Sequence, residues 1–459
     1  MKEYDIISIG SGSATSIVTQ ALSGDNTLSA AIIEKDAPGG ICLTRGCIPS
    51  KMILYPAELI SNIYQSSKFG IDVDINDIDF DTIMNRMRDH VDEQSKNIGK
   101  NLERSDEIDF YHTKGEFIDD YILKVGKKKI KGKKIFIGSG SEPLIPDIKG
   151  LDESGYITSE GLLRLKELPE KVVVIGGGYI AAEYGFFLSM MGSKVTIIGR
   201  NDQFVPGEEP EISDVLKKRL SRYMKIYTGL EAVSVKRKDD TKLVIAENGK
   251  GKRKGFKCDE ILVAAGRKSN SEYLKPRRSS IETDEKGWIK VNEKMETSKK
   301  NIWAFGDATG EHMFKHVANQ EAEIVYYNAF TERERKMDYH AVPHAIFTNP
   351  EVASVGMLEE EANGKFETLI GYYPFEDTGK GMAMMSEDHF VKVIVEKNTY
   401  RILGAHIVGP QASILVQEVV NLMNTQDQSA NPIFRGMHIH PALSEVVERA
   451  FYNLHSHHH

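Results

Sequence analysis

Two of the three cysteines in this chain, Cys42 and Cys47, are separated by only four residues. A disulfide between them would close a short loop and constrain the unfolded chain little, so structural stabilisation explains the spacing poorly. The spacing instead suits a disulfide that opens and closes during a reaction. Pro49 follows at once and is well placed to begin a helix, whose free N–H groups lower the pKa of a nearby thiol. The alternative interpretation is a pair of ordinary buried thiols.

A glycine-rich turn precedes the cysteines. An apolar strand is predicted over residues 4–9, and Gly10 and Gly12 follow it directly. Glycines at these positions allow a tight turn and the close approach of a pyrophosphate to the N–H groups of the next helix. Thr15 occupies the third glycine position of the usual pattern, which is a departure from it. The segment therefore predicts a dinucleotide-binding fold at the N-terminus.

A second predicted strand, over residues 30–34, ends in Glu34. An acidic side chain at this place can accept hydrogen bonds from the hydroxyl groups of a ribose. Glu34 therefore favours an adenosine without a 2′-phosphate, as in FAD.

The same pattern occurs again in the middle of the chain. An apolar strand at residues 171–175 runs into Gly176 and Gly178, and a further strand ends before Arg200, where the first copy has its acid. A guanidinium there can bind a 2′-phosphate, which favours NADP over NAD. The alternative is that Arg200 is an ordinary solvated charge. Two glycine turns together predict two dinucleotides, one of them NAD or NADP.

Four shorter motifs complete the pattern, and they lie at residues 136–140, 264–267, 304–307 and 440–445. With the cysteine loop and the two glycine turns, they make the chain resemble the flavoprotein disulfide reductases over essentially its whole length. This family includes dihydrolipoyl dehydrogenase, glutathione reductase, mycothione reductase and mercuric reductase.

The resemblance implies an α/β fold with two Rossmann-like dinucleotide-binding domains, for FAD and NAD(P), and a C-terminal α+β dimerisation domain. We expect the FAD-binding domain at residues 1–150 and 266–340, the NAD(P)-binding domain at 151–265, and the dimerisation domain at 341–459.

The resemblance also assigns roles to the reactive side chains. Cys47 is expected to be the thiol beside the flavin, and Cys42 the thiol that exchanges with the substrate. His440, oriented by Glu445, is expected to carry protons during this exchange. In the family this histidine serves the cysteine pair of the other subunit, so a homodimer is expected. We also expect Pro441 to begin the helix that follows His440.

Lys51 and Glu183 resemble the family's ion pair beside the flavin and nicotinamide rings. Tyr179 resembles an aromatic residue that covers an empty nicotinamide pocket, although packing at a helix start is an equally good explanation. The residues expected to bind FAD are Gly10, Gly12, Ser13, Ala14, Glu34, Lys35, Gly40, Lys51, Gly138, Ser139, Gly140, Asp307 and His316. Those expected near NAD(P) or at the domain crossing are Gly176, Gly178, Tyr179, Ile180, Glu183, Arg200, Gly266 and Arg267.

The substrate expected first is dihydrolipoamide, either free or carried on a lipoyl domain, because the His440 motif and His316 resemble those of dihydrolipoyl dehydrogenase. Arg200 and the second glycine turn resemble NADPH-dependent reductases of low-molecular-weight disulfides, such as mycothione or glutathione reductase. This is the alternative. A mercuric reductase or a large thioredoxin reductase is disfavoured because no cysteine follows Cys258. A flavoprotein scaffold without enzymatic activity is the third possibility.

Composition is that of a globular protein. The chain has 459 residues, 40% hydrophobic residues and a formal net charge of −8, which offers no attraction to nucleic acid. The basic run at residues 124–134 is expected to be a solvated hairpin. No signal peptide or membrane span is predicted, so we expect a cytoplasmic enzyme of cell redox homeostasis. No metal site is expected, and the histidines at 455–459 are either native or part of a tag.

Overall fold

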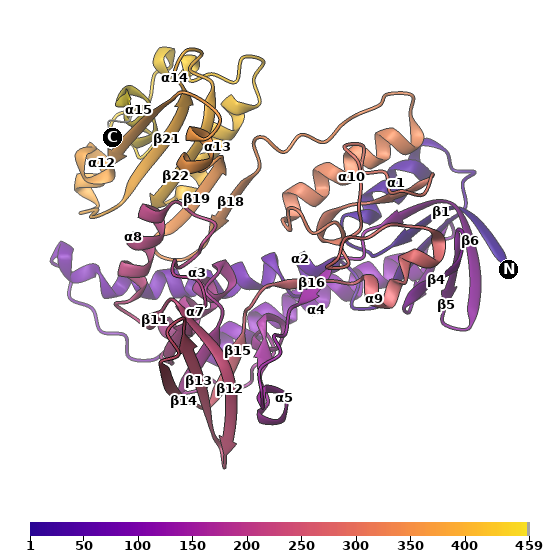
Figure 1. Cartoon of the computed structure of the whole chain (residues 1–459), viewed down its shortest axis with the longest axis horizontal. Helices are drawn as coiled ribbons and strands as arrows, with labels where there is room; N and C mark the ends of the chain where they lie inside the picture. The colour runs from indigo at the N-terminus through magenta and orange to yellow at the C-terminus, as the bar shows by residue number, and fades with distance from the viewer. Residues whose placement is uncertain (457–459) are drawn as a thin grey trace. The chain divides into compact units, whose positions relative to one another are not determined.

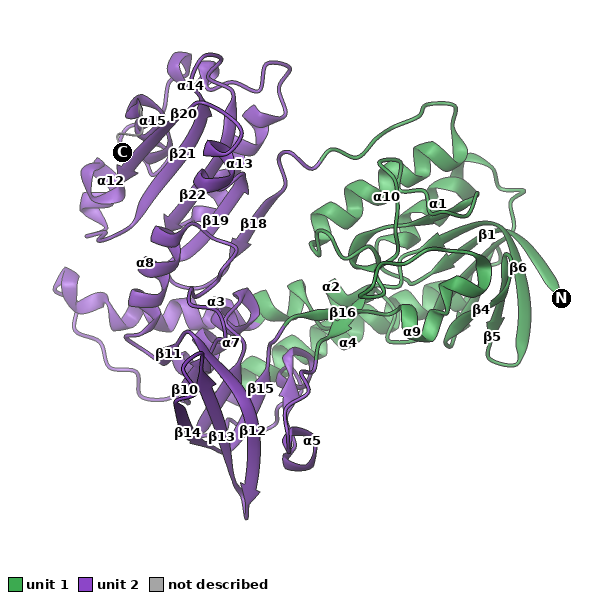
Figure 2. Cartoon of the chain, viewed as in Figure 1, with its two compact units in different colours: residues 1–52, 82–144, 266–338 green, residues 53–81, 145–265, 339–459 purple. Residues whose placement is uncertain are grey.

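A computed structural model describes residues 1–456, so His457, His458 and His459 of the terminal histidine run lie outside the described residues. The chain forms two compact units, shown in Figures 1 and 2. Unit 1 contains residues 1–52, 82–144 and 266–338, and unit 2 contains the remaining segments. Residues 53–81 and 145–150, which the predicted domain division placed with FAD, belong to unit 2.

Unit 1 is built on a sheet whose central strands are parallel. Strand β1 pairs in parallel with β2 and β6, β2 with β3, and β17 with β6, while β4, β5 and β6 pair antiparallel. These strands are β1 (Lys2–Ile9), β2 (Ala30–Glu34), β3 (Ile108–His112), β4 (Gly115–Asp119), β5 (Ile122–Val125), β6 (Lys128–Ile137) and β17 (Ile302–Ala304). The central strands are rich in isoleucine because both faces of a parallel sheet are buried. The predicted basic hairpin is formed by β5 and β6.

Helices α1 (Ala14–Gly24) and α10 (Lys315–Phe330) lie together along this sheet (Figure 1). Helix α4 (Phe80–Glu103) buries Met84, Met87 and Val91, whose spacing makes one apolar stripe on an otherwise polar helix. The other elements of unit 1 are α2 (Gly40–Thr44), the start of α3 (Cys47–Tyr64), β7 (Ser141–Pro143), β16 (Arg267–Ser269), α9 (Ser271–Leu274), η2 (Pro276–Ser279) and η3 (Gly306–Ala308). Both α3 and α4 contain a boundary between the two units.

Unit 2 contains a second parallel sheet, in the strand order β11-β10-β9-β15-β8. A three-stranded antiparallel sheet, β12-β13-β14, shares a hydrophobic core with it. The strands are β8 (Ile157–Thr158), β9 (Lys171–Ile175), β10 (Lys194–Ile198), β11 (Lys225–Tyr227), β12 (Leu230–Lys238), β13 (Thr241–Asn248), β14 (Arg253–Cys258) and β15 (Glu260–Val263). The helices are η1 (Ser66–Phe69), α5 (Leu151–Ser154), α6 (Ser159–Leu162), α7 (Tyr179–Met191) and α8 (Pro210–Leu220). Cys258 is the last residue of β14 and is buried, and burial raises the pKa of its thiol to about 12.

The C-terminal part of unit 2 is an antiparallel sheet in the order β18-β19-β22-β21-β20-β23. Helix α13 packs against β19 and β22, and α15 packs against β20 and β21. The strands are β18 (Pro343–Ile346), β19 (Glu351–Gly356), β20 (Thr368–Pro374), β21 (Phe390–Glu396), β22 (Ile402–Gly409) and β23 (Leu454–Ser456). The helices are α11 (Glu359–Asn363), η4 (Phe375–Asp377), α12 (Gly379–Ala383), α13 (Ala412–Met423), α14 (Asn431–Arg435) and α15 (Glu445–Tyr452).

The predicted fold class is confirmed, since two dinucleotide-type α/β folds are followed by an α+β domain. Among residues 1–456, no helix combines the length and the apolar character that crossing a membrane requires.

Candidate functional site

Close packing of glycines forms one end of a cleft in unit 1. Gly10 has a φ of +105°, and a Cβ there would lie 2.2 Å from the carbonyl oxygen of Gly138. Gly40 has a φ of +73°, and its Cβ would lie 2.6 Å from the Cα of Gly12. Because two pairs of loops approach this closely, side chains at Gly10 and Gly40 would push the loops apart. The close packing of these four glycines therefore holds the neighbouring loops against the turn that leads into α1, where Ser13 and Ala14 lie.

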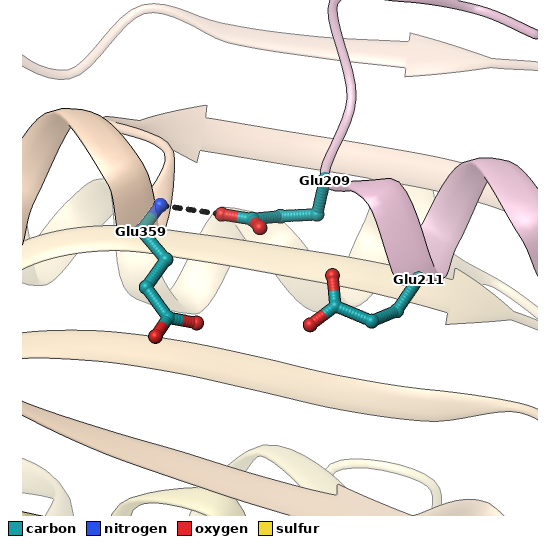
Figure 3. A group of neighbouring side chains, drawn as sticks. All are labelled: Glu209, Glu211 and Glu359. Atoms are coloured by element: carbon teal, nitrogen blue, oxygen red, sulfur yellow. Dashed lines mark hydrogen bonds between the residues drawn. The ribbon is translucent and has the colours of Figure 1, made fainter. Parts of the chain in front are cut away.

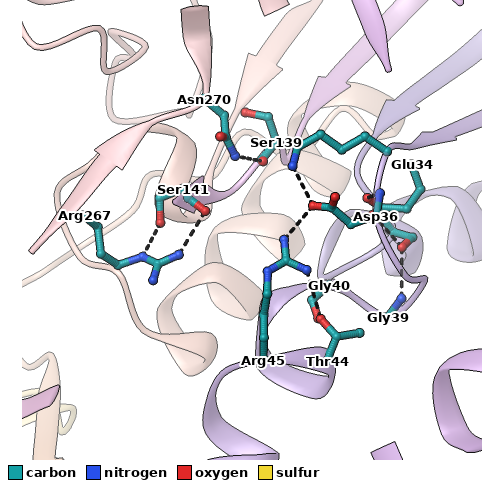
Figure 4. Close-up of polar contacts among 12 residues, drawn as sticks. Glu34, Asp36, Gly39, Gly40, Thr44, Arg45, Ser139, Ser141, Arg267 and Asn270 are labelled. Atoms are coloured by element: carbon teal, nitrogen blue, oxygen red, sulfur yellow. Dashed lines mark hydrogen bonds and ion pairs between the residues drawn. The ribbon is translucent and has the colours of Figure 1, made fainter. Parts of the chain in front are cut away.

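Glu34 lies at the end of β2 and lines the same cleft. Its carboxylate accepts hydrogen bonds from the N–H and hydroxyl groups of Ser11, at 2.9 and 2.8 Å, and from the N–H of Asp36 at 2.9 Å. These bonds fix the carboxylate at the cleft wall. Both bonds from Ser11 end on Oε2, so Oε1, which accepts the bond from Asp36, is the oxygen that can accept a further bond. Figure 4 shows this end of the cleft.

The cleft encloses about 1000 Å³, including its solvent-open part, and brings together most of the predicted FAD-binding residues. Those that line it are Gly10, Gly12, Ser13, Ala14, Glu34, Lys35, Gly40, Gly138, Ser139, Gly140 and Asp307. Of the residues that the structure describes, Lys51 and His316 were also predicted but do not line it. Glycines at both loop crossings, a helix start and an acid at the β2 end fit a dinucleotide such as FAD.

Cys42 and Cys47 line this cleft as well, both as free thiols. Helix α3 begins at Cys47, close to Pro49, so the predicted helix start lies beside the pair. A hydrogen bond from Cys47, with help from Lys315 and the N–H groups of Cys47 and Ile48, lowers the pKa of the Cys42 thiol to about 7. The same hydrogen bond, together with burial, raises the pKa of Cys47. The two thiols therefore titrate as a coupled pair, in which the hydrogen bond between them favours the loss of one proton and opposes the loss of the second.

Asp307 is held by two neighbours at the cleft. Its carboxylate accepts a hydrogen bond from the Ser141 hydroxyl at 2.5 Å and lies 3.6 Å from Nε of Arg267. Arg267 also donates to the carbonyl oxygen of Ser141 at 2.9 Å, and Asn270 donates to the carbonyl oxygen of Ser139 at 2.8 Å. These bonds, with the β7–β16 pairing, join the two chain segments of unit 1 that meet at Gly266.

Arg45 and Asp36 line the cleft and were not identified from the sequence. Arg45 lies between the two cysteines, and its guanidinium is 2.7 Å from the Asp36 carboxylate. Lys315, whose charge favours the Cys42 thiolate, was also missed. Two features of the sequence could have indicated Arg45 and Asp36: a cation inside the cysteine loop, and an acid two residues after Glu34.

The second glycine turn lies in unit 2, between β9 and α7. Gly176 has a φ of +133°, and a Cβ would lie 2.1 Å from the carbonyl oxygen of Ala264. Gly178 precedes the first residue of α7, Tyr179, whose side chain is exposed, and Ile180 is half-buried. Both glycine turns therefore show the same close approach of a neighbouring loop, to Gly138 in unit 1 and to Ala264 in unit 2.

Glu183 is buried in α7, and its carboxylate accepts the backbone N–H of Phe347 at 3.0 Å. Arg200 is exposed two residues beyond the end of β10. Its place after the strand leaves the guanidinium available to a ligand at the second glycine turn.

His440 and Glu445 form a hydrogen-bonded pair in unit 2. Nδ1 of His440 lies 2.8 Å from one carboxylate oxygen of Glu445, and the other oxygen accepts the N–H of Ala442 at 3.0 Å. The bond to His440 lowers the pKa of Glu445, as does the N–H of Ala442. The expected helix start at Pro441 is wrong, because α15 begins at Glu445 and the peptide bond before Pro441 is cis. The side chain of His440 is 75% exposed, so its Nε2 edge is open for proton transfer.

Three carboxylates, Glu209, Glu211 and Glu359, form the acidic group in Figure 3. The ammonium of Lys392 lies 2.9, 3.0 and 2.6 Å from them respectively, and its side chain is only 4% exposed. Since Lys392 already occupies the centre of the group, these acids form an ion cluster around it, which is buried at Glu209 and open to solvent at Glu211. Glu209 also accepts the backbone N–H of Glu359 at 2.6 Å, as Figure 3 shows.

Comparison with known proteins gives matches over most of the chain. The family model described as pyridine nucleotide-disulphide oxidoreductase matches residues 4–322, and the dimerisation domain of the same family matches residues 342–451.

Individual relatives match over nearly the whole length. Mycothione reductase from Mycobacterium tuberculosis is 32% identical, covering 99% of this chain and 100% of the relative. Dihydrolipoyl dehydrogenase from Chlamydia trachomatis is 34% identical, covering 96% of this chain and 94% of the relative. Among solved structures, the Cu(II) complex of the HOCl-induced flavoprotein disulfide reductase RclA from Escherichia coli has a TM-score of 0.87 and 28% identity, covering 98% of this chain and 99% of that chain.

Proposed function

The chain belongs to the pyridine nucleotide-disulphide oxidoreductase family, and on that premise we propose that it moves electrons between NAD(P)(H) and a small dithiol or disulfide through Cys42 and Cys47. The family uses FAD and NAD(P)H, and FAD, when bound, supplies two-electron transfer between a nicotinamide and the cysteine pair. The observation that carries the proposal is that both thiols line the cleft formed by the glycines and Glu34.

The chain's own residues supply the sulfur and proton chemistry. In dithiol oxidation, a substrate thiolate attacks Sγ of Cys42, the Cys42–Cys47 bond breaks, and its electron pair stays on Cys47. The second substrate thiol then attacks the sulfur joined to Cys42, which leaves oxidised substrate and two reduced cysteines. Nε2 of His440 accepts the proton of the first attacking thiol, because Nδ1 is bound to Glu445. His440 passes this proton to solvent before it accepts the proton of the second thiol. Disulfide reduction follows the reverse order.

His440 of one subunit acts on the cysteine pair of the other in this proposal. The match of residues 342–451 to the family's dimerisation domain supports a homodimer. From the family match over residues 4–322 we propose that Lys51 and Glu183 each act beside the flavin and nicotinamide rings. We also propose that the enzyme is cytoplasmic.

Dihydrolipoamide is the substrate proposed first, because the chain is 34% identical to a dihydrolipoyl dehydrogenase over 96% of its length. The second candidate is an NADPH-dependent reductase of a low-molecular-weight disulfide. It is favoured by the exposed Arg200 after β10 and by 32% identity to a mycothione reductase over 99% of the chain.

Steady-state turnover separates the two. Dihydrolipoamide oxidation with NAD⁺ or NADP⁺ should exceed the reduction of mycothione, glutathione and other thiol disulfides with NADH or NADPH. Turnover of a thiol disulfide with no lipoamide activity would select the second candidate.

The role of the cysteine pair has its own test. Cys42→Ser should abolish disulfide exchange and leave reduction of bound FAD by NAD(P)H, while Cys258→Ser, a substitution at the third cysteine, should leave both reactions intact. Addition of one reducing equivalent without oxygen should give wild type the long-wavelength absorption of a thiolate against the flavin. Loss of FAD reduction in Cys42→Ser would contradict the proposed order of electron transfer.

A further inference from the structure

A second cleft, of about 1090 Å³ including its solvent-open part, lies within unit 2. Its walls come from the last turn of α3 with the residues that follow it, from the end of α8, and from the segment between α12 and β21. It contains none of the residues assigned above to nucleotide binding or thiol chemistry.

The walls carry more positive than negative charge. Lys68, Arg219 and Arg222 line the cleft, and Glu387 is the carboxylate among its described lining residues. Arg219 lies 3.6 Å from Glu387 and 3.3 Å from Asp388, which also pairs with a lysine of α8. Among the described residues, neither Lys68 nor Arg222 forms an ion pair. With Asp388 and its partner Lys218 included, four cations in and beside the cleft face two carboxylates, which leaves a surplus of two positive charges.

Arg219 is the buried member of this group. Its side chain is 7% exposed, and its Nε has no hydrogen-bond partner among the described residues. A buried donor without a partner costs free energy, so an acceptor that entered the cleft and reached this group would be bound favourably.

The excess positive charge lowers the pKa values of Lys68 and His389, which line the cleft. Burial lowers the pKa of Lys68, and the charges of Arg219 and Arg222 lower it further. Burial and the same cations, with Lys68, lower the pKa of His389 to about 4. The positive charge in the cleft is therefore incompletely neutralised by the chain.

The rest of the wall divides into polar and apolar parts. Asn62, Gln65 and Tyr223 can hydrogen-bond to a ligand, while Phe69 and Met384 offer apolar surface. Such a wall suits an anionic group attached to a small organic body.

We propose that this cleft binds a phosphate-bearing small molecule, with Lys68, Arg219 and Arg222 contacting the phosphate group. A phosphate monoester carries between one and two negative charges near neutrality, which matches the surplus better than a single carboxylate does. The guanidinium of Arg222 can also bind two phosphate oxygens in a bidentate manner, while Arg219 offers its Nε.

The test uses the FAD-loaded enzyme and inorganic phosphate as the probe, with NADP⁺ saturating and ionic strength held constant. Calorimetric titration should show saturable phosphate binding to wild type. The double substitution Lys68→Gln with Arg222→Gln should weaken this binding about tenfold or more. The matched control is Lys250→Gln with Lys252→Gln, which removes two exposed lysine charges from the turn after β13 and should bind like wild type.

A third variant distinguishes a ligand site from a structural cluster. Glu387→Gln removes the lining carboxylate, whose side chain is 64% exposed, and should strengthen phosphate binding. Circular dichroism and melting temperature establish that each variant is folded. Absence of saturable binding to wild type, or equal binding by the Lys68/Arg222 variant and its control, would overturn the proposal.

Discussion

The guanidinium of Arg45 lies 2.7 Å from the carboxylate of Asp36, and this ion pair joins the loop between the two cysteines to the chain just after β2 (Figure 4). Lys35 contacts the same carboxylate at 2.6 Å. Burial alone would raise the pKa of Asp36, but the two cations outweigh it and lower the pKa. Arg45 also donates to the hydroxyl of Thr44 at 3.1 Å, which in turn donates to the carbonyl oxygen of Gly40 at 2.8 Å.

Replacing Arg45 by methionine should loosen the cysteine loop. We expect the free energy of unfolding to fall by about 1 kcal/mol, because Lys35 still partners Asp36. Disulfide exchange should slow more than reduction of FAD by NAD(P)H, since only exchange depends on the cysteine loop. Arg104→Met, at an exposed arginine just after α4, is the control. Equal melting temperatures and equal exchange rates in the two variants would show that Arg45 does not hold the cysteine loop in place.

The reactivity of Cys42 should change near neutral pH. Its thiol has a pKa of about 7 instead of the ordinary 9.0, so the reduced enzyme should be alkylated by iodoacetamide with an inflection near that value. A thiolate is the reactive form, and its fraction rises as the pH passes the pKa. Cys47→Ala removes the hydrogen-bond donor and should move the inflection upward, and Lys315→Met should move it in the same direction by less. An inflection at the ordinary value in wild type would contradict the described contact.

The sequence predicted the reactive and nucleotide-binding residues of the site better than the contacts that hold them in place. Gly10 and Gly176 were predictable because each directly follows an apolar strand, where the turn needs a backbone conformation that glycine allows, and both have a positive φ in the structure. Gly40 was expected from the family resemblance of the cysteine segment. The Arg45–Asp36 pair was not predictable, because neighbours in space nine residues apart leave no periodic pattern.

The C-terminal motif shows a second limit. The pairing of His440 with Glu445 was predicted from their separation, but the helix start was misplaced at Pro441. A proline after histidine is typical of a first helical turn, yet here the chain reaches Glu445 before the helix begins. The carboxylate of Glu445 also accepts a hydrogen bond from the N–H of Ala442, which the helix propensities of these residues do not indicate.

Reversal of charge at Arg200 should change the choice of nucleotide. If this exposed guanidinium contacts the 2′-phosphate, Arg200→Glu should raise KM for NADPH about tenfold and alter KM for NADH little. Arg237→Glu, an exposed site on β12, is the control for the overall change in charge. The ratio of kcat/KM for the two nucleotides measures the effect. An equal change in both would show that Arg200 does not touch the phosphate.

Glu445 should contribute stability that depends on pH. Its pKa in the folded chain is lowered below the ordinary 4.5, mainly by the hydrogen bond with His440. The contribution is therefore complete above the unfolded pKa and is lost as the pH falls through the lower folded value. Urea unfolding should show wild type more stable than Glu445→Gln at neutral pH, with the difference shrinking toward about pH 3. A difference that grows in acid would contradict this sign.

The ion cluster around Lys392 offers the largest expected loss of stability. Lys392→Met would leave Glu209, whose side chain is 3% exposed, without its closest cation in a site with little access to water. Breaking one partner of a buried ion pair commonly costs about 3–5 kcal/mol, because the remaining charge is desolvated and unpaired. Lys397→Met is the matched control, since that lysine is half-exposed and lies 3.8 Å from the exposed Glu367. Its loss should cost well under about 1 kcal/mol. Urea unfolding of both variants measures the difference, and the combined change Lys392→Met with Glu209→Gln should recover part of the stability. If the two lysine variants unfold at the same urea concentration, the ion pairs of Lys392 do not stabilise unit 2.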